Sequence, residues 1–92
     1  MILSFADQDT ADFFAGVRVK RFVNMAAVTQ RKLQMLDSAV VLEALRVPPS
    51  NRLEALVADR NGQHSIRIND QWRLCFVWAA DGVYDVQIVD YR

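Results

Sequence analysis

The stretch from Gln63 to Tyr91 limits the possible folds more than any other part of the chain. It contains three runs rich in Ile, Val, Trp, Tyr and Phe, which are separated by the short polar segments 69–71 and 80–82. Runs of this composition, broken by Asn, Asp and Gly, are typical of consecutive β-hairpins. We therefore expect three antiparallel strands in this part of the chain.

The alternation of side chains predicts the register of the first hairpin. The apolar residues that we place on the buried face are Ile66, Ile68, Trp72, Leu74, Phe76 and Trp78. Ile66 must then pair with Leu74, because a slip by one residue would turn the apolar set of one strand to the opposite face. The same register sets Arg67 directly opposite Arg73.

The third strand brings a tyrosine to the arginine pair. We expect this strand to turn Tyr84, Val86 and Ile88 inward. In that arrangement Tyr91 lies diagonal to Arg73 on the face away from the core. Like charges directly opposite each other on paired strands are destabilising, so two arginines there favour an anion such as a phosphate.

The first 21 residues predict a short strand, a short helix and a basic segment. Residues 2–5 are β-prone and suit an edge strand. Asp9 or Thr10 is placed to cap a helix that Gly16 would end. The basic segment 17–21 is either a solvated loop or a contact with RNA or a protein partner.

The middle of the chain has the spacing of a helix. Apolar residues recur every three or four positions from Phe22 to Val40, which predicts an amphipathic helix on one face of the sheet. Asp37 and Ser38 interrupt this pattern and are placed to cap a second, short helix that buries Leu45.

The prolines at 48 and 49 end the helical part, because neither has an amide hydrogen to donate. Residues 52–57 follow as a short strand. The order of strand, helices and antiparallel strands predicts an α+β fold, with N-terminal helices packed on one face of a small, mainly antiparallel sheet. Residues 1–92 are too few for a second core, so we expect a single domain.

Charge and composition narrow the function. Eleven basic and eleven acidic residues give zero net charge, which argues against binding long nucleic acids through bulk electrostatics. Nine of the basic residues are arginine, which suits planar contact with phosphate. One cysteine and one histidine cannot supply a metal shell, so we expect no metal or cofactor. The lone cysteine and the lack of a long apolar run favour the cytoplasm and no membrane contact.

The candidates for chemistry gather on the outer face of the predicted sheet. They are Glu54, Arg67, Arg73, Asp90, Tyr91 and Arg92. His64 falls on the same side as Ile66, toward the core, so we do not expect it to be catalytic. Two interpretations stay open. One is a phosphate-handling site, and the other is a solvated polar face whose arginines pair weakly with Glu54, Asp85 or Asp90.

Three segments closely resemble one protein family. Residues 48–56 read Pro-Pro-Ser-Asn-Arg-Leu-Glu-Ala-Leu, residues 65–73 read Ser-Ile-Arg-Ile-Asn-Asp-Gln-Trp-Arg, and residues 88–91 read Ile-Val-Asp-Tyr. These strings are similar to those of the HigB toxins in the RelE/ParE superfamily of type II toxin–antitoxin systems. The resemblance implies a RelE-like fold and a ribosome-dependent mRNA endonuclease that inhibits translation. It also implies a HigA antitoxin, which is a helix-turn-helix DNA-binding protein. The toxin would be brought to operator DNA only through this antitoxin.

The resemblance also implies roles for individual residues in a metal-independent reaction, in which a ribose 2′-hydroxyl attacks the adjacent phosphate. Arg73 matches the arginine on the scissile phosphate, and Arg67 matches a second cation. Glu54 matches a proposed base, and Tyr91 an aromatic residue that positions the nucleotide. The terminal Arg92 completes the catalytic set. The residues expected to contact the substrate are Arg60 and Asp90.

Two departures from the family pattern leave alternatives open. HigB proteins usually end in histidine, whereas this chain has Arg92, which cannot exchange protons near neutral pH. Val57 stands where some relatives carry lysine. One alternative is therefore an attenuated toxin that acts mainly by binding its antitoxin, and another is a ParE-like inhibitor of DNA gyrase. Because Arg73 faces away from the core, we expect its replacement to change the free energy of unfolding by at most about 0.5 kcal/mol.

Overall fold

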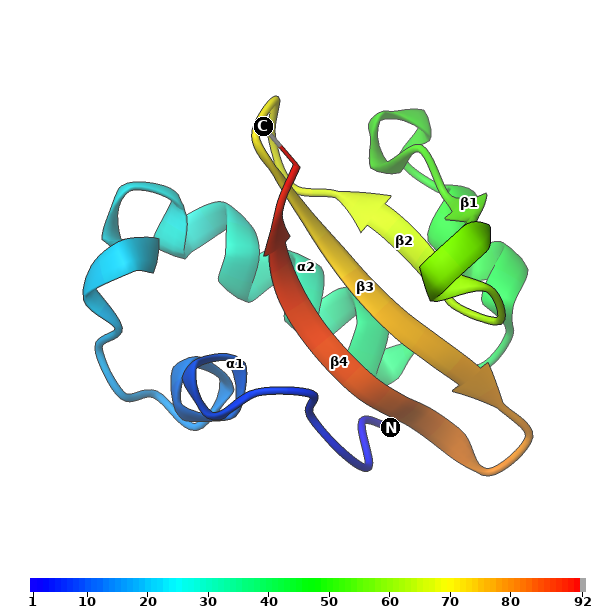
Figure 1. Cartoon of the computed structure of the whole chain (residues 1–92), viewed down its shortest axis with the longest axis horizontal. Helices are drawn as coiled ribbons and strands as arrows, with labels where there is room; N and C mark the ends of the chain where they lie inside the picture. Colours follow the sequence, from blue (N-terminus) through cyan, green and yellow to red (C-terminus); the bar gives the residue numbers. More distant parts are fainter. Residues whose placement is uncertain (92) are drawn as a thin grey trace.

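A four-stranded antiparallel sheet in the order β1-β2-β3-β4 forms the second half of the chain in the computed structural model, which describes residues 1–91 (Figure 1). The strands are β1 (Glu54–Ala55), β2 (His64–Arg67), β3 (Trp72–Ala79) and β4 (Gly82–Asp90). The α-helices are α1 (Gln8–Phe14) and α2 (Ala26–Ser38). Short 3-10 helices are η1 (Lys20–Met25), η2 (Leu42–Arg46), η3 (Pro49–Asn51) and η4 (Ala58–Arg60). The predicted α+β class is confirmed.

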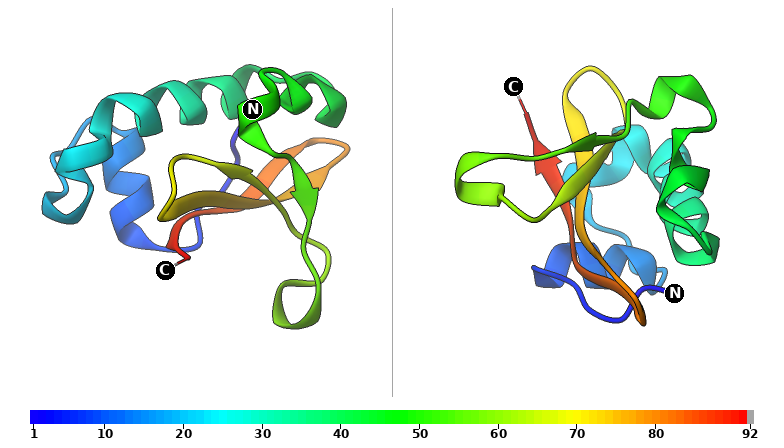
Figure 2. Two further views of the ribbon diagram at one scale, coloured as in Figure 1. Left: turned by 90° about the horizontal axis from the view of Figure 1, so that it is seen from above. Right: turned by 90° about the vertical axis from the view of Figure 1, so that its right-hand side faces the viewer.

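The helices and the β1–η4 segment lie on opposite sides of the sheet. Helix α2 runs across one face, whereas the loop that carries η4 projects from the other (Figure 2). The core lies between the helices and the sheet. Its fully buried members are Phe22, Leu33, Leu36, Leu45, Ile66, Leu74, Phe76, Val83, Val86 and Ile88. Within residues 1–91, no helix has the length and apolarity that crossing a membrane requires.

The predicted register of the first hairpin is confirmed. Ile66 pairs with Leu74, and Arg67 with Arg73. In the second hairpin Arg73 pairs with Val89, so the start of β3 and the end of β4 lie side by side as expected.

The expected burial of Tyr84 is wrong, because β4 contains an irregularity. The β3–β4 pairing shifts between Cys75 and Val77, and Asp85 takes a left-handed backbone conformation with φ of 54°. The extra residue in β4 reverses the face of the sheet to which the β4 residues before Asp85 point. Val83 is therefore buried in place of Tyr84, whose hydroxyl donates a hydrogen bond to Asp81 (2.6 Å).

The N-terminal segment lies along β4 and leads into α1. Ile2 and Phe5 form parallel bridges with β4, as an edge strand would. The capping prediction is wrong by two residues or more, because Asp7 is the N-cap and its carboxylate accepts the Thr10 N–H (2.8 Å). Gly16, with φ of 97°, follows the helix as expected.

The predicted middle helix and strand are both longer than the observed elements. Helix α2 begins only at Ala26, and Val40 beyond its end is 89% exposed. Neither Asp37 nor Ser38 caps the next helix, since the N-cap of η2 is Val41. The Asp37 carboxylate instead accepts the N–H of Ile2 (2.8 Å) and so ties α2 to the N-terminal segment. The expected strand 52–57 shortens to β1, because Arg52 (φ 47°) leaves the extended conformation just before it.

Candidate functional site

Arg73 is the centre of the outer face of the sheet. Its Nε donates to Ser65 Oγ (2.8 Å), and its Nη2 donates to the carbonyl oxygen of Arg52 (2.8 Å). Nη2 also lies 2.9 Å from Glu54 Oε1, and Cζ lies 5.9 Å from the centroid of the Tyr91 ring. The Arg73 side chain is only 11% exposed. Four neighbours therefore hold the guanidinium in one orientation and cover most of the side chain.

The short strand β1 explains why Glu54 reaches Arg73. Glu54 pairs with Ser65 across the β1–β2 ladder, and Ser65 neighbours Arg73 on the outer face. The Glu54 carboxylate is 57% exposed, so it meets both the arginine and solvent. A carboxylate in this position is accessible to a proton that a bound substrate would release.

The loop before β1 is held by a buried amide. Asn51 is fully buried, and its Nδ2 donates to the carbonyl oxygens of Leu45 (3.0 Å) and Val47 (3.3 Å). The ammonium of Lys32 on α2 donates to Asn51 Oδ1. Burial lowers the pKa of Lys32, with smaller contributions from neighbouring positive charges. These contacts hold the loop in place, so that the Arg52 carbonyl oxygen accepts its hydrogen bond from Arg73.

Arg67 lies opposite Arg73 but has its own partner. Its guanidinium forms an ion pair with the carboxylate of Asp70, whose side chain is fully exposed. Each arginine of the cross-strand pair therefore faces a carboxylate of the same chain. Of the partners that the polar-face interpretation named, Glu54 does pair with Arg73, whereas Asp70, which pairs with Arg67, was not foreseen.

Tyr91 and Cys75 contact each other beside the arginines. The Tyr91 hydroxyl lies 3.8 Å from Cys75 Sγ. Burial is the main cause that raises the pKa of both groups, and their mutual hydrogen bond raises that of Tyr91 further. The Tyr91 phenol is therefore protonated at neutral pH, and its hydroxyl is in contact with the Cys75 sulfur.

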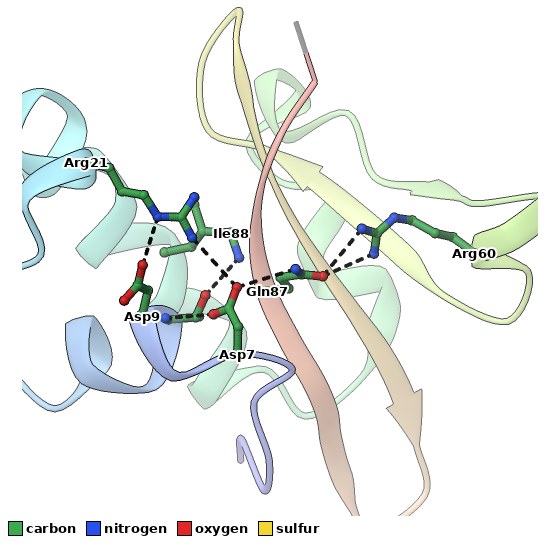
Figure 3. Close-up of polar contacts among 7 residues, drawn as sticks. Asp7, Asp9, Arg21, Arg60, Gln87 and Ile88 are labelled. Carbon is green, nitrogen blue, oxygen red and sulfur yellow. Dashed lines mark hydrogen bonds and ion pairs between the residues drawn. The ribbon is translucent and has the colours of Figure 1, made fainter.

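Arg60 reaches the outer face from η4. It donates from Nη1 to Gln63 Oε1 (3.1 Å), and both Nη1 and Nη2 lie 3.4 Å from Gln87 Oε1 on β4 (Figure 3). Gln87 is paired with Cys75, so this contact is made on the same face as Arg73. The expected substrate residue Arg60 thus lies with the site.

Asp90 is not brought into this group. Asp90 pairs with Trp72, so strand alternation turns it to the face opposite Tyr91, and it accepts a hydrogen bond from Gln71 Nε2 (3.0 Å). Arg92 lies outside the described residues. His64 stacks on Phe76 with 6.2 Å between the ring centroids, on the core side of the sheet.

Sequence reasoning missed three groups that hold the cations. Ser65 lies two residues before Arg67 in β2 and therefore points to the same outer face, so the predicted register could have identified it. The Arg52 carbonyl depends on a left-handed backbone conformation, which no local motif announces. Gln87 could also have been identified, because the expected pairing of Arg73 with Val89 places Gln87 opposite Cys75 on the same face.

A sequence model of the family described as RelE-like toxin of type II toxin-antitoxin system HigB matches residues 3–92. The chain belongs to the HigB-like toxin family. A toxin named HigB-1 from Vibrio cholerae serotype O1 is 39% identical over 85 residues, which cover 90% of this chain and 88% of the relative. An uncharacterised protein of Haemophilus influenzae is 35% identical over 65 residues, covering 71% of this chain and 64% of its own length.

The fold of this HigB-like toxin also matches a solved structure. A chain of the YoeB–YefM complex from Staphylococcus aureus superposes with a TM-score of 0.63 and covers all of this chain, and 95% of that chain is matched. The two sequences are only 20% identical, so the match supports the RelE-like fold alone.

Proposed function

We propose that this HigB-like toxin is a ribosome-dependent mRNA endonuclease that inhibits translation. The observation that carries the proposal is the fixed guanidinium of Arg73, which lies between the Glu54 carboxylate and the Tyr91 ring on the outer face of the sheet. Family membership supports it, because toxins of the HigB and RelE type are in general ribonucleases.

The proposed reaction needs a base, a cation and an acid, and no metal or cofactor. The ribose 2′-oxygen forms a bond to the adjacent phosphorus, and the bond from phosphorus to the 5′-oxygen breaks. The base removes the proton of the 2′-hydroxyl, and an acid supplies a proton to the leaving 5′-oxygen. The products are a 2′,3′-cyclic phosphate and a 5′-hydroxyl end.

The residues of the site suit these roles. Glu54, as the exposed carboxylate, acts as the base, and Arg73 stabilises the negative charge that develops on the phosphate. Tyr91 positions the nucleotide and offers a protonated hydroxyl near the leaving group. Arg67 supplies a second cation.

The remaining predicted residues have weaker structural support. Arg60 faces the site and is proposed to contact the substrate, as the next subsection develops. Asp90 is turned away from Arg73, so it could contact the substrate only where an RNA strand passes over the end of β4. For Arg92 the proposal of charge stabilisation rests on the family match alone.

We further propose that a HigA-type helix-turn-helix antitoxin neutralises the toxin in the cytoplasm and that operator DNA is contacted only through it. Membership in a toxin–antitoxin family supports an antitoxin partner. On the surface, a hollow between α1 and η1 offers a partner both apolar and charged groups. It is lined by the exposed Val17, by the basic residues Arg18, Lys20 and Arg21, and by Asp9 and Asp12.

Mapping of RNA 5′ ends on ribosomes tests the proposal. Expression of the toxin without antitoxin is expected to produce new 5′-hydroxyl ends within translated mRNA and to arrest growth. Arrest with intact mRNA and altered DNA supercoiling would replace the proposal with gyrase inhibition. No arrest, together with tight antitoxin binding, would replace it with an attenuated toxin.

A further inference from the structure

Arg60 differs from Arg67 and Arg73 in the kind of group that it contacts. Arg67 and Arg73 each face a carboxylate, which offsets their charge. Arg60 instead donates to the side-chain amide oxygens of Gln63 and Gln87. An amide accepts hydrogen bonds without carrying a charge, so these contacts orient the guanidinium and leave its positive charge available to an anion.

A contact between Gln87 and Asp7 determines which end of the Gln87 amide faces Arg60. Its Nε2 lies 3.4 Å from Asp7 Oδ2, as Figure 3 shows. An ionised carboxylate only accepts hydrogen bonds, so it holds the NH₂ end and turns the oxygen toward the arginine. Asp7 is itself fixed, because its Oδ1 caps α1 at Thr10 N (2.8 Å) and Arg21 Nη2 lies 3.8 Å from Oδ2.

Arg60 and Arg73 lie near the same pair of groups. Gln87 is directly opposite Cys75 in the β3–β4 pairing, and Cys75 contacts the Tyr91 hydroxyl. Burial raises the pKa of Cys75 and of Tyr91, and the positive charges of both arginines act against that rise. The Cys75–Tyr91 pair is therefore within electrostatic reach of both guanidinium groups.

We infer that Arg60, oriented by Gln87, forms a second phosphate-binding position beside Arg73, so that the toxin takes an RNA strand by two phosphates. This inference rests on the proposed function and names its substrate as an oligonucleotide with at least two phosphates. Gln87 is a positioning residue, since it acts through Arg60.

The two arginines then have different roles. Arg73 is held at the reacting phosphate by four neighbours, and its loss lowers the rate at saturating substrate. Arg60 contacts a phosphate that does not react, so its loss raises the concentration needed for half-saturation and leaves the saturated rate unchanged. Replacement of Gln87 by glutamate would neutralise Arg60 and place a second negative charge beside Asp7, so it should imitate the loss of Arg60.

The test is a titration of the folded toxin with uncleavable 2′-O-methyl oligonucleotides, followed by NMR of the arginine Nε–Hε resonances. A trinucleotide with two internucleotide phosphates should shift the Arg60 and Arg73 resonances, whereas a dinucleotide with one phosphate should bind more weakly. Arg60→Gln and Gln87→Glu should each weaken trinucleotide binding about tenfold, the scale of one charge-assisted contact. The double variant should lose at least as much as Arg60→Gln alone, because the introduced carboxylate then has no cation to offset it and repels the phosphate.

Arg31→Gln is the matched control, because it removes one positive charge from the exposed side of α2. It should leave trinucleotide affinity within about twofold of the parent. Parental affinity in Arg60→Gln, an Arg60 resonance that does not move, or an equal loss in Arg31→Gln would each overturn the inference. Cleavage of ribosome-bound mRNA by the parent is measured separately. A parent that binds RNA through Arg60 and cuts nothing would refute the proposed function while the second phosphate position stands.

Discussion

At the scale of single residues, Arg73 shows which properties of a site residue can be predicted from the alternation of side chains along a strand. Its place opposite Arg67 follows from the apolar pattern alone and is confirmed by the pairing. Its burial does not follow, because it depends on the Arg52 carbonyl and the Glu54 carboxylate, which arrive from a loop with an irregular backbone. Alternation indicates the face of a residue but not what covers that face.

The covered position changes the expected stability of Arg73→Ala. The deletion leaves the buried Ser65 hydroxyl and the Arg52 carbonyl without their donor, so it should lower the free energy of unfolding by about 1–3 kcal/mol. The sequence-based expectation of a negligible effect is therefore revised. Arg67→Ala, which breaks only a pair with an exposed carboxylate, should stay within about 0.5 kcal/mol. Urea unfolding of both variants measures the difference, and equal midpoints would contradict the bracing described for Arg73.

The buried thiol of Cys75 predicts the dependence of stability on alkaline pH. Burial raises its pKa above the ordinary value of 9.0, so the folded state holds the proton more tightly than the unfolded state. The associated stability is complete below pH 9.0 and is lost as the pH rises through the folded pKa. Cys75→Ala should flatten this decline, leaving the contribution of Tyr91 at higher pH. The free energy of unfolding between pH 7 and 10.5 is the measurement, and identical slopes would refute the assignment.

At the scale of elements, the hairpin β2–β3 could be predicted in full, whereas β4 could be predicted only beyond Asp85. Strict alternation specifies a register because a slip exposes the core face. An added residue in a left-handed conformation breaks alternation, and an aspartate there looks like any polar strand residue. The cap of α1 was misplaced for a similar reason. Asp7, Asp9 and Thr10 are all suitable capping residues, and only the contact with Thr10 N distinguishes them.

The irregularity in β4 can be tested with one pair of variants. Asp85 has φ of 54°, which glycine adopts freely and a β-branched residue resists. Asp85→Val should therefore lower the free energy of unfolding by about 1–2 kcal/mol, and Asp85→Gly should leave it nearly unchanged. Thermal melting of the two variants decides the point. A valine variant as stable as the glycine variant would mean that this residue is extended in solution.

At the scale of the whole molecule, the two faces of the sheet have separate tasks. Helix α2 buries one face and supplies the core, while the segment before β2 covers the other and carries Glu54 and Arg60 to the site (Figure 2). The division follows from composition, since apolar spacing marks the helices and polar alternation marks the outer face. The path of the covering segment does not follow from it, because that path is set by buried contacts of Asn51.

The measurement that tests the account most directly is single-turnover cleavage of ribosome-bound mRNA by the parent and by Arg73→Ala, each shown by melting to be folded at the assay temperature. The parent is expected to leave 2′,3′-cyclic phosphate ends, and the variant to cleave about 10²–10³-fold more slowly, the cost of one lost electrostatic stabiliser of a transition state. A folded Arg73→Ala protein that cleaves mRNA at the parental rate would contradict it.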